Sequence, residues 1–172
     1  MSTRATYFDG WLVEHVRPLL AANGYRGGPR RFHRRNEAGC TVIEFQRSMG
    51  STPEESRFIV NIGSWNRGFS AVSGDGVDRC PAPSRCQIVT RLGDRPAQER
   101  WWVVDHAPDA DNAAETRQLL EAQKDEGFPF LDRVGTDNDF EAFWRAIDQP
   151  WAQEMLAYLD LARAAHDGSP AT

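Results

Sequence analysis

The sequence predicts an α+β protein: a single domain with a mainly antiparallel sheet of four to six strands, and an N-terminal helix and C-terminal helices packed on one face. Three observations predict this class. Apolar residues recur at helical spacing near the N-terminus, five segments rich in β-branched and aromatic residues follow, and the last third returns to helical spacing. A chain of 172 residues can bury a core of its own. We expect the domain to span residues 1–166 and residues 167–172 to form a frayed tail.

The first helix is predicted from apolar residues that recur every three or four positions. They are Phe8, Trp11, Leu12, Val16, Leu19 and Leu20. Asn23-Gly24 supplies a C-terminal stop. Pro18 lies inside the pattern, so the helix either kinks there or restarts with the proline in a first turn.

Five strands are expected, at residues 30–36, 40–48, 56–65, 86–92 and 100–105, and turn clusters such as NEAG separate them. The connection at residues 66–85 has no clear periodicity. Twenty such residues are long for a compact domain, and loops of this kind tend to be lids, binding loops or disordered segments. A short strand at residues 69–72 would shorten the loop.

Three helices are expected in the last third of the chain. Asn112, followed three residues later by a glutamate, fits a capping box, and the helix that it opens is predicted to stop at Gly127. Asp137 or Asp139 is expected to cap a second helix. Pro150 is expected to open the third.

Side chains alternate across a strand, so the strands can be assigned to two faces. One face is fully apolar and must be covered by helices. The other mixes apolar groups with hydrogen-bonding ones, and its candidate binding residues are Glu44, Gln46, Asn61, Arg91 and Trp101. We expect Arg91 to pair with Glu44, and Gln46 and Asn61 to bring donors and acceptors beside Trp101. The face is either the floor of a groove or a polar network beneath a covering helix.

The ordered segments RPLLAANGYR, RRFHRR…TVIEFQRS, RFIVNIGSW, CQIVTRLGD and RWWVV resemble the bacterial family known as domain of unknown function 4304, over roughly residues 8 to 147. The best matching positions are Phe32, Gln46, Asn61, Gly63, Arg91, Gly93 and Trp102. The resemblance implies an α+β fold with an antiparallel sheet. It implies no activity, since none is established for the family.

The charge is uneven along the chain, whose net charge is −5. Residues 1–104 hold fifteen arginines against ten acidic residues, with a cluster of arginines in PRRFHRR at residues 29–35. As a strand, this segment places Phe32 toward the core and Arg31 and Arg35 on the other face. A charged edge strand that guards against sheet pairing is the favoured interpretation, and an anion or nucleic-acid contact is the alternative. With a net negative charge, we expect no specific nucleic-acid binding.

The sequence has no long apolar segment and no CxxC pair, and these two observations predict the compartment and the state of the cysteines. No run approaches 18 apolar residues, and Asp9 and Glu14 interrupt any leader-like segment, so we expect no membrane partner and a cytoplasmic location. Cys40, Cys80 and Cys86 make an odd count without a CxxC pair, and we interpret them as free thiols.

The function that we infer first is non-catalytic binding of a protein or a small polar ligand, through the polar sheet face and the loop at residues 66–85. The alternative is a metal-dependent hydrolase or nuclease in which Glu44 holds a divalent cation together with a loop acid, Asp75 or Asp78. No glycine-rich phosphate-binding motif is present, so no cofactor is expected.

Overall fold

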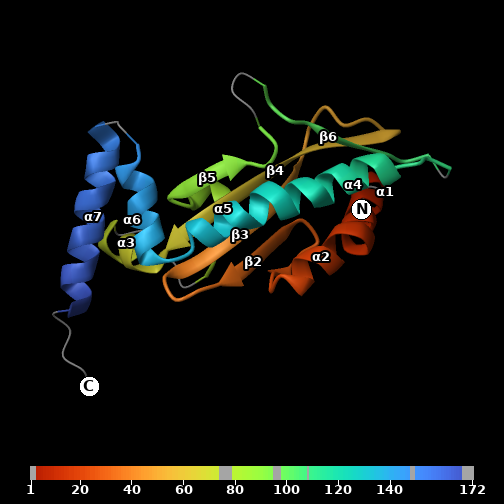
Figure 1. The fold of residues 1–172 in the computed structure, drawn as a ribbon. Helices are drawn as coiled ribbons and strands as arrows, with labels where there is room; N and C mark the ends of the chain where they lie inside the picture. Colours follow the sequence, from red (N-terminus) through yellow and green to blue (C-terminus); the bar gives the residue numbers. More distant parts are fainter. Residues whose placement is uncertain (1–2, 74–78, 95–97, 108, 148–149, 168–172) are drawn as a thin grey trace.

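The computed structural model describes the chain except for residues 1–2, 74–78, 95–97, 108, 148–149 and 168–172 (Figure 1). The predicted tail therefore lies outside the described residues beyond Asp167. Within the described part, no helix has both the length and the apolar character that crossing a membrane requires.

The chain opens with one long helical run. α1 (Thr3–Trp11) passes through a π-helical turn, η1 (Leu12–Val16), into α2 (Arg17–Ala22), and Pro18 stands in the first turn of α2. Proline has no N–H for the carbonyl four residues earlier, and the wider turn directly before it accommodates that gap. The sequence left open a kink at Pro18 or a new helix that begins there, and the structure has a new helix with Pro18 in its first turn.

A second helical run repeats this design. α4 (Ala113–Ala122) continues through the π-helical turn η3 (Gln123–Gly127) into α5 (Phe128–Arg133), with Pro129 in the first turn of α5. The predicted stop at Gly127 is wrong, because the helix runs through it. A Cβ at Gly127 would lie 2.5 Å from Nε2 of Gln123, so this glycine is explained by close packing and not by termination.

In the described part of the chain the sheet has six strands. They are β1 (Arg26–Gly27), β2 (Arg31–Arg35), β3 (Gly39–Arg47), β4 (Glu55–Asn66), β5 (Ile88–Arg91) and β6 (Trp102–Asp105). All pairs are antiparallel in the order β1-β2-β3-β4-β5, and β6 also pairs with β4. Because β4 is long, β5 and β6 share one side of it, opposite residues 61–64 and 55–58. The predicted α+β fold and antiparallel sheet are confirmed.

The two helical runs lie on one face of the sheet (Figure 1). Between them and the strands lies the main core, which contains Phe8, Leu12, Leu20, Phe32, Ile43, Phe45, Phe58, Val60, Ile62, Trp102 and Leu131. The predicted apolar face is therefore the covered one. The other face carries no α-helix of the described chain.

A smaller helical group closes one end of the sheet. α3 (Arg67–Ser73), α6 (Asp137–Arg145) and α7 (Pro150–Asp167) pack there around a second apolar cluster that includes Phe69 and Ile88. The strand predicted at residues 69–72 is wrong. Instead a helix forms, because Asn66 Oδ1 accepts the Phe69 N–H at 3.0 Å, as an N-cap does.

The helix starts at residues 112 and 136 differ in detail from the capping predictions. The side chain of Asn112 does not cap α4. It exchanges two hydrogen bonds of 2.9 Å with the backbone of Asp105 and so ties α4 to β6. α6 is capped by Thr136, whose Oγ1 accepts the N–H of Asp139, and not by an aspartate. α7 begins at Pro150 as predicted.

Candidate functional site

The polar side chains on the uncovered side of the sheet come from neighbouring strands. Glu44 of β3 pairs in register with Asn61 of β4, which pairs with Arg91 of β5. Gln46 lies two residues beyond Glu44 and therefore points the same way. We call this side, which carries Arg31, Glu44, Gln46, Asn61 and Arg91, the open face.

The ion pairs on the open face differ from the expected one. Arg31 donates to Oε1 of Glu44 from both Nε and Nη2, at 2.8 and 2.5 Å, and Arg91 instead pairs with Glu99. The expected pair between Glu44 and Arg91 is wrong. Glu44 pairs with Arg31 because of the strand order. Arg31 of β2 stands directly opposite Glu44 in the ladder, whereas β4 lies between Glu44 and Arg91.

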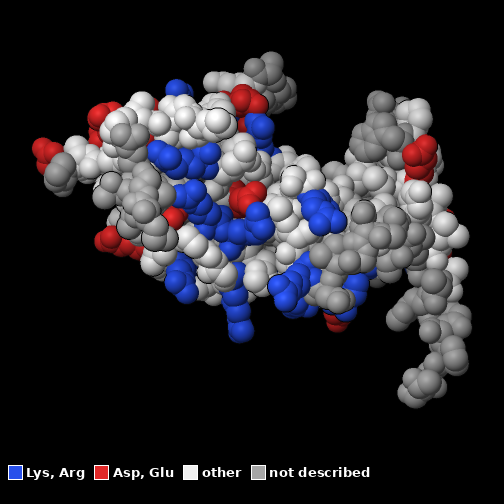
Figure 2. Space-filling view, turned by 180° about the vertical axis from the view of Figure 1, so that it is seen from behind, with Lys and Arg blue, Asp and Glu red and all other residues white. Residues whose placement is uncertain are grey.

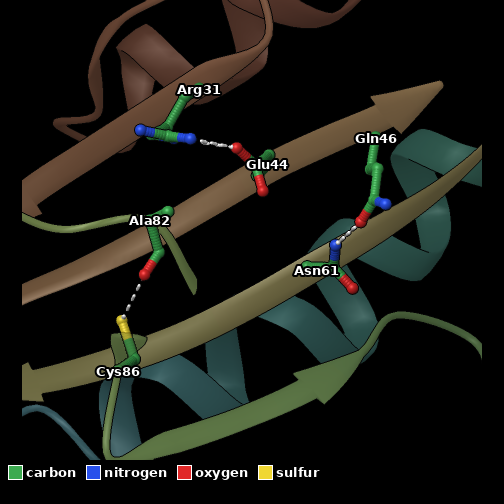
Figure 3. A network of polar contacts seen from close by, with 6 residues as sticks. All are labelled: Arg31, Glu44, Gln46, Asn61, Ala82 and Cys86. Atoms are coloured by element: carbon green, nitrogen blue, oxygen red, sulfur yellow. Dashed lines mark hydrogen bonds and ion pairs between the residues drawn. The ribbon is translucent and has the colours of Figure 1, made fainter. Parts of the chain in front are cut away.

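The two amides of the open face bond to each other. Asn61 Nδ2 donates to Gln46 Oε1 at 2.9 Å, and the two side chains point toward one another across β3 and β4 (Figure 3). Gln46 is exposed and Asn61 half-buried. These amides are therefore not a network sealed beneath a helix.

A groove of about 580 Å³ runs over these residues. Its lining consists of Arg30, Arg31, Glu44, Phe45, Gln46, Arg47, Asn61, Ala82, Ser84 and Val89. Val89 is 51% exposed and offers an apolar surface next to the polar groups. Trp101 is 36% exposed and stands just before β6, but it does not line the groove, and neither does Arg91. Three of the five predicted site residues thus line one hollow.

The segment at residues 79–87 forms one wall of the groove and covers the rest of the open face. Its short helix η2 (Pro83–Arg85) lies against β3 and β4, and Ala82 and Ser84 face the groove. The Cys86 thiol donates to the Ala82 carbonyl at 3.7 Å (Figure 3). The long loop predicted here is therefore in part a packed wall, while residues 74–78 lie outside the described chain.

The three cysteines are free thiols and lie together where this wall packs on the sheet. Cys40 is buried with Trp65, and Cys80 and Cys86 pack against it. Burial, with Cys80 alongside, raises the pKa of Cys40 far above its ordinary value, and burial raises the pKa of Cys86 to about 12. At neutral pH both groups are protonated, so they are poor nucleophiles and poor metal ligands.

The arginines of PRRFHRR have separate partners. Arg30 donates to Asp9 of α1 at 2.5 Å, and Arg34 pairs with Asp132 of α5. Arg34 also stacks over the ring of Tyr25, 4.9 Å from its centroid. These two ion pairs connect β2, and the residue that precedes it, to the helices α1 and α5. β2 is not the outermost strand, since the two-residue β1 pairs with it.

Arginines gather on the uncovered side of the molecule (Figure 2). Among the outward positions of the strands there, Arg31, Arg35, Arg57 and Arg91 stand with three acids, Glu44, Glu55 and Asp105. The anion contact that the sequence left as an alternative therefore finds arginines on this side, but acids are interspersed among them.

Sequence reasoning missed two arginines of the groove. Arg47, at the end of β3, belongs to the lining, but its side chain follows the alternation to the helical side, where Nε donates to Ser56 Oγ at 3.0 Å. Arg30 falls inside the strand predicted at residues 30–36, but it precedes β2 in the structure and belongs to the lining of the groove. The signal that could have found them is the excess of arginine over acids around β2 and β3.

A second hollow, of about 530 Å³, lies between the two helical runs and is lined in part by Trp11, Thr116 and Leu120. The charged side chains at this hollow, Arg117 and Lys124 among them, are exposed to solvent. Exposed charges are well hydrated and gain little from a ligand. The groove of the open face is therefore the stronger candidate.

The family model of the domain of unknown function DUF4304 matches residues 16–133, more than half of the chain. The protein belongs to the DUF4304 family. No curated protein and no solved structure matches the chain. In this DUF4304 protein the lining of the groove lies entirely within the matched residues, whereas α6 and α7 lie outside them.

A metal site at Glu44 finds little support among its neighbours. Gln46, Asn61 and Arg31 surround this carboxylate, and divalent cations prefer several carboxylate oxygens. Within the described residues no group of three His, Cys, Asp or Glu side chains could hold a metal ion. Asp75 and Asp78, the predicted partners of Glu44, lie outside the described residues.

Proposed function

We propose that this DUF4304 protein is a non-catalytic binding module that takes up a protein or a small polar ligand on its open face, with the segment at residues 79–87 as one wall. The observation that supports this most is the groove of about 580 Å³, which combines hydrogen-bonding side chains with the exposed apolar Val89. Binding sites for small ligands are typically hollows of about 300–1,000 Å³ with a few placed polar groups.

The chemistry of the groove favours binding over catalysis. The Glu44 carboxylate already accepts two hydrogen bonds from Arg31, so one of its oxygens is occupied within the protein itself. The groove residues include no cysteine and no histidine. Ser84 also lines the groove, but no hydrogen bond joins it to Glu44, so the nucleophile–base pair that is typical of covalent catalysis is not formed by these described residues.

Two neighbouring residues of β5 provide a matched test. Val89→Trp fills the groove, whereas Thr90→Trp adds the same bulk one residue away, on the other face of the same strand; both positions are exposed. Each variant and the wild type would be isolated from the native host and compared by native mass spectrometry and affinity capture. We expect Val89→Trp to lose the bound species and Thr90→Trp to keep it.

Two controls make this comparison decisive. Both variants must show the same thermal unfolding midpoint as the wild type within a few degrees, so that a loss of capture reports the groove and not the fold. Equal retention of the same ligand or partner by both tryptophan variants would contradict the proposal.

A further inference from the structure

The edge of the sheet at β5 carries unpaired backbone groups, whereas the neighbouring edge at β6 is covered. β5 is the last strand in the order β1-β2-β3-β4-β5, and β6 pairs with β4 farther along the same side. In Figure 1, β5 lies at the border of the sheet and no further strand lies beyond it. Both strands have four residues, so their outer edges can be compared directly.

The register shows which backbone groups of β5 point outward. The Leu92 N–H donates to the Val60 carbonyl at 2.9 Å, so these two residues form a hydrogen-bonded pair of the antiparallel ladder. Hydrogen-bonded and non-hydrogen-bonded pairs alternate along such a ladder. Val89 and Arg91 therefore occupy non-hydrogen-bonded positions, and their N–H and C=O groups point away from β4. None of these four backbone groups has a hydrogen-bond partner among the described residues.

The equivalent groups of β6 are bonded to side chains at the start of α4. The Val103 N–H donates to Glu115 Oε1 at 3.1 Å, and the Asp105 N–H donates to Asn112 Oδ1 at 2.9 Å. Asn112 Nδ2 also donates to the Asp105 carbonyl at 2.9 Å. Proteins commonly cover a strand edge in this way, because its unpaired groups form a template for another strand. In the described chain this cover does not extend to β5.

The side chains of β5 add an apolar group and a cation to this edge. Val89 is 51% exposed, Thr90 is exposed on the opposite face, and Arg91 is half-buried on the same face as Val89. Glu99, the carboxylate partner of Arg91, is itself exposed. A guanidinium carries five N–H donors, so Arg91 can bind a second carboxylate.

We propose that an extended segment of a partner protein adds to the sheet as an antiparallel strand along the outer edge of β5. Its backbone bonds to the outward N–H and C=O groups of Val89 and Arg91, and its alternate side chains supply specificity, as is usual for strand addition. The segment that fits carries an acidic residue opposite Arg91 and, two residues later, an apolar residue opposite Val89. A residue of high β-propensity lies between them, opposite Thr90.

The length of the edge favours an extended peptide over a second copy of this chain. Four strand residues span about 13 Å. A stable contact between two folded proteins buries about 1,200–2,000 Å², which an edge of this length does not supply alone. A peptide needs no matching surface elsewhere on the molecule. The inference goes beyond the proposed function, because backbone groups of β5 carry it whether or not a ligand fills the groove.

The test is a titration of the ¹⁵N-labelled protein with the acetylated and amidated peptide Thr-Glu-Thr-Val-Thr and its Leu and Phe variants at the fourth position. At saturation we expect hydrogen exchange of the Val89 and Arg91 amides to slow by about tenfold or more. The Thr90 amide already bonds to β4, so its exchange should change by less than about twofold.

Methylated peptides identify the backbone bonds directly. In the added strand, the N–H groups of the glutamate and of the apolar residue face β5, whereas that of the central threonine faces away. N-methylation of either of the first two should weaken binding by about tenfold or more, because it removes a donor and places a methyl group against the edge. N-methylation of the central threonine should change binding by less than about twofold.

Two substitutions at one position separate the backbone from the side chain. Arg91→Ala removes only the cation, and we expect binding to weaken by about twofold to fivefold, as for an exposed ion pair. Arg91→Pro also removes the outward N–H, a change that edge strands tolerate, and should weaken binding by a further fivefold to tenfold or about that. Equal urea midpoints for the two variants exclude damage to the fold as the cause.

The proposal is overturned if none of the three peptides protects the Val89 and Arg91 amides, or if all methylated peptides bind equally well. Protection of the same amides that grows with protein concentration, without peptide, would assign the edge to a second copy and also overturn it. Failure of the proposed function is distinguishable, because Arg91 does not line the groove. A species captured through the groove should remain bound to Arg91→Pro, while the peptide is lost.

Discussion

Replacing the two amides of the open face by alanine tests whether they line an open groove or belong to a buried hydrogen-bond network. The variants are Gln46→Ala, Asn61→Ala and the double substitution. One hydrogen bond of 2.9 Å joins the pair, Gln46 is exposed and Asn61 only half-buried. A net hydrogen bond contributes about 0.5–1.5 kcal/mol, and solvent replaces it readily at an exposed site. We expect each single substitution to lower the free energy of unfolding by less than about 1 kcal/mol.

Ser64→Ala supplies the buried comparison within the same sheet. Ser64 is 3% exposed, and its hydroxyl donates to the Val134 carbonyl at 2.8 Å. Its removal withdraws a donor from a carbonyl that water cannot easily reach, which costs about 1–3 kcal/mol. Urea denaturation followed by tryptophan fluorescence measures all four variants. Losses above about 2 kcal/mol for both Gln46→Ala and Asn61→Ala would refute the open groove.

Two further predictions concern packing and pH. Gly39→Ala should lower the free energy of unfolding by more than about 2 kcal/mol, since its Cβ would stand 2.1 Å from the Trp65 carbonyl oxygen, while Gly50→Ala should change it by less than about 0.5 kcal/mol in the same urea assay. Burial raises the pKa of Cys86 from 9.0 to about 12, so the folded state holds this proton more tightly than the unfolded state. The contribution of this thiol to the free energy of unfolding is complete below about pH 9 and is lost toward pH 12, by up to about 1.4 kcal/mol per pH unit. Urea denaturation between pH 8 and 10.5 should therefore show a shallower loss of the free energy of unfolding for Cys86→Ser than for the wild type. An equally steep alkaline loss in Cys86→Ser would contradict the assignment of that loss to this thiol.

Strand positions and faces could be predicted because burial imposes a strict alternation. Each of the five predicted strands lies within two residues of an observed one at both ends, and Glu44, Gln46 and Asn61 emerge on the same side. A one-residue slip would turn Ile43 and Phe45 out of the core, so the register is determined by the apolar residues alone. Local patterns suffice where hydrophobic burial decides.

The errors occur where the outcome depends on contacts between segments distant in sequence. Glu44 binds Arg31 and not Arg91 because strand order, which alternation does not encode, makes Arg31 its neighbour. Asn112 bonds to Asp105 across an interface rather than to its own helix. In both cases the residue type was interpreted correctly as a hydrogen-bonding group, and the partner was supplied by the tertiary structure.

Pro18 and Pro129 show that proline and glycine mark helix interruptions with different reliability. Each stands two residues after a π-helical turn, in the first turn of the helix that continues the run. Proline was correctly taken as a point of interruption at residue 18. At Gly127 the glycine was taken as a stop, although the proline two residues later marks a restart of the same kind.

The groove and its support belong to one continuous stretch of the chain. Arg47, Ser56 and His106, which hydrogen bonds join on the helical side of the sheet, all lie within residues 16–133, the part matched by the DUF4304 model. Asp9, which neutralises Arg30, lies outside that part. A chain reduced to the matched residues would therefore keep the anchored Arg47 and release Arg30 from its carboxylate. The positive charge of the groove thus originates within the DUF4304 domain itself, and the N-terminal helix moderates it.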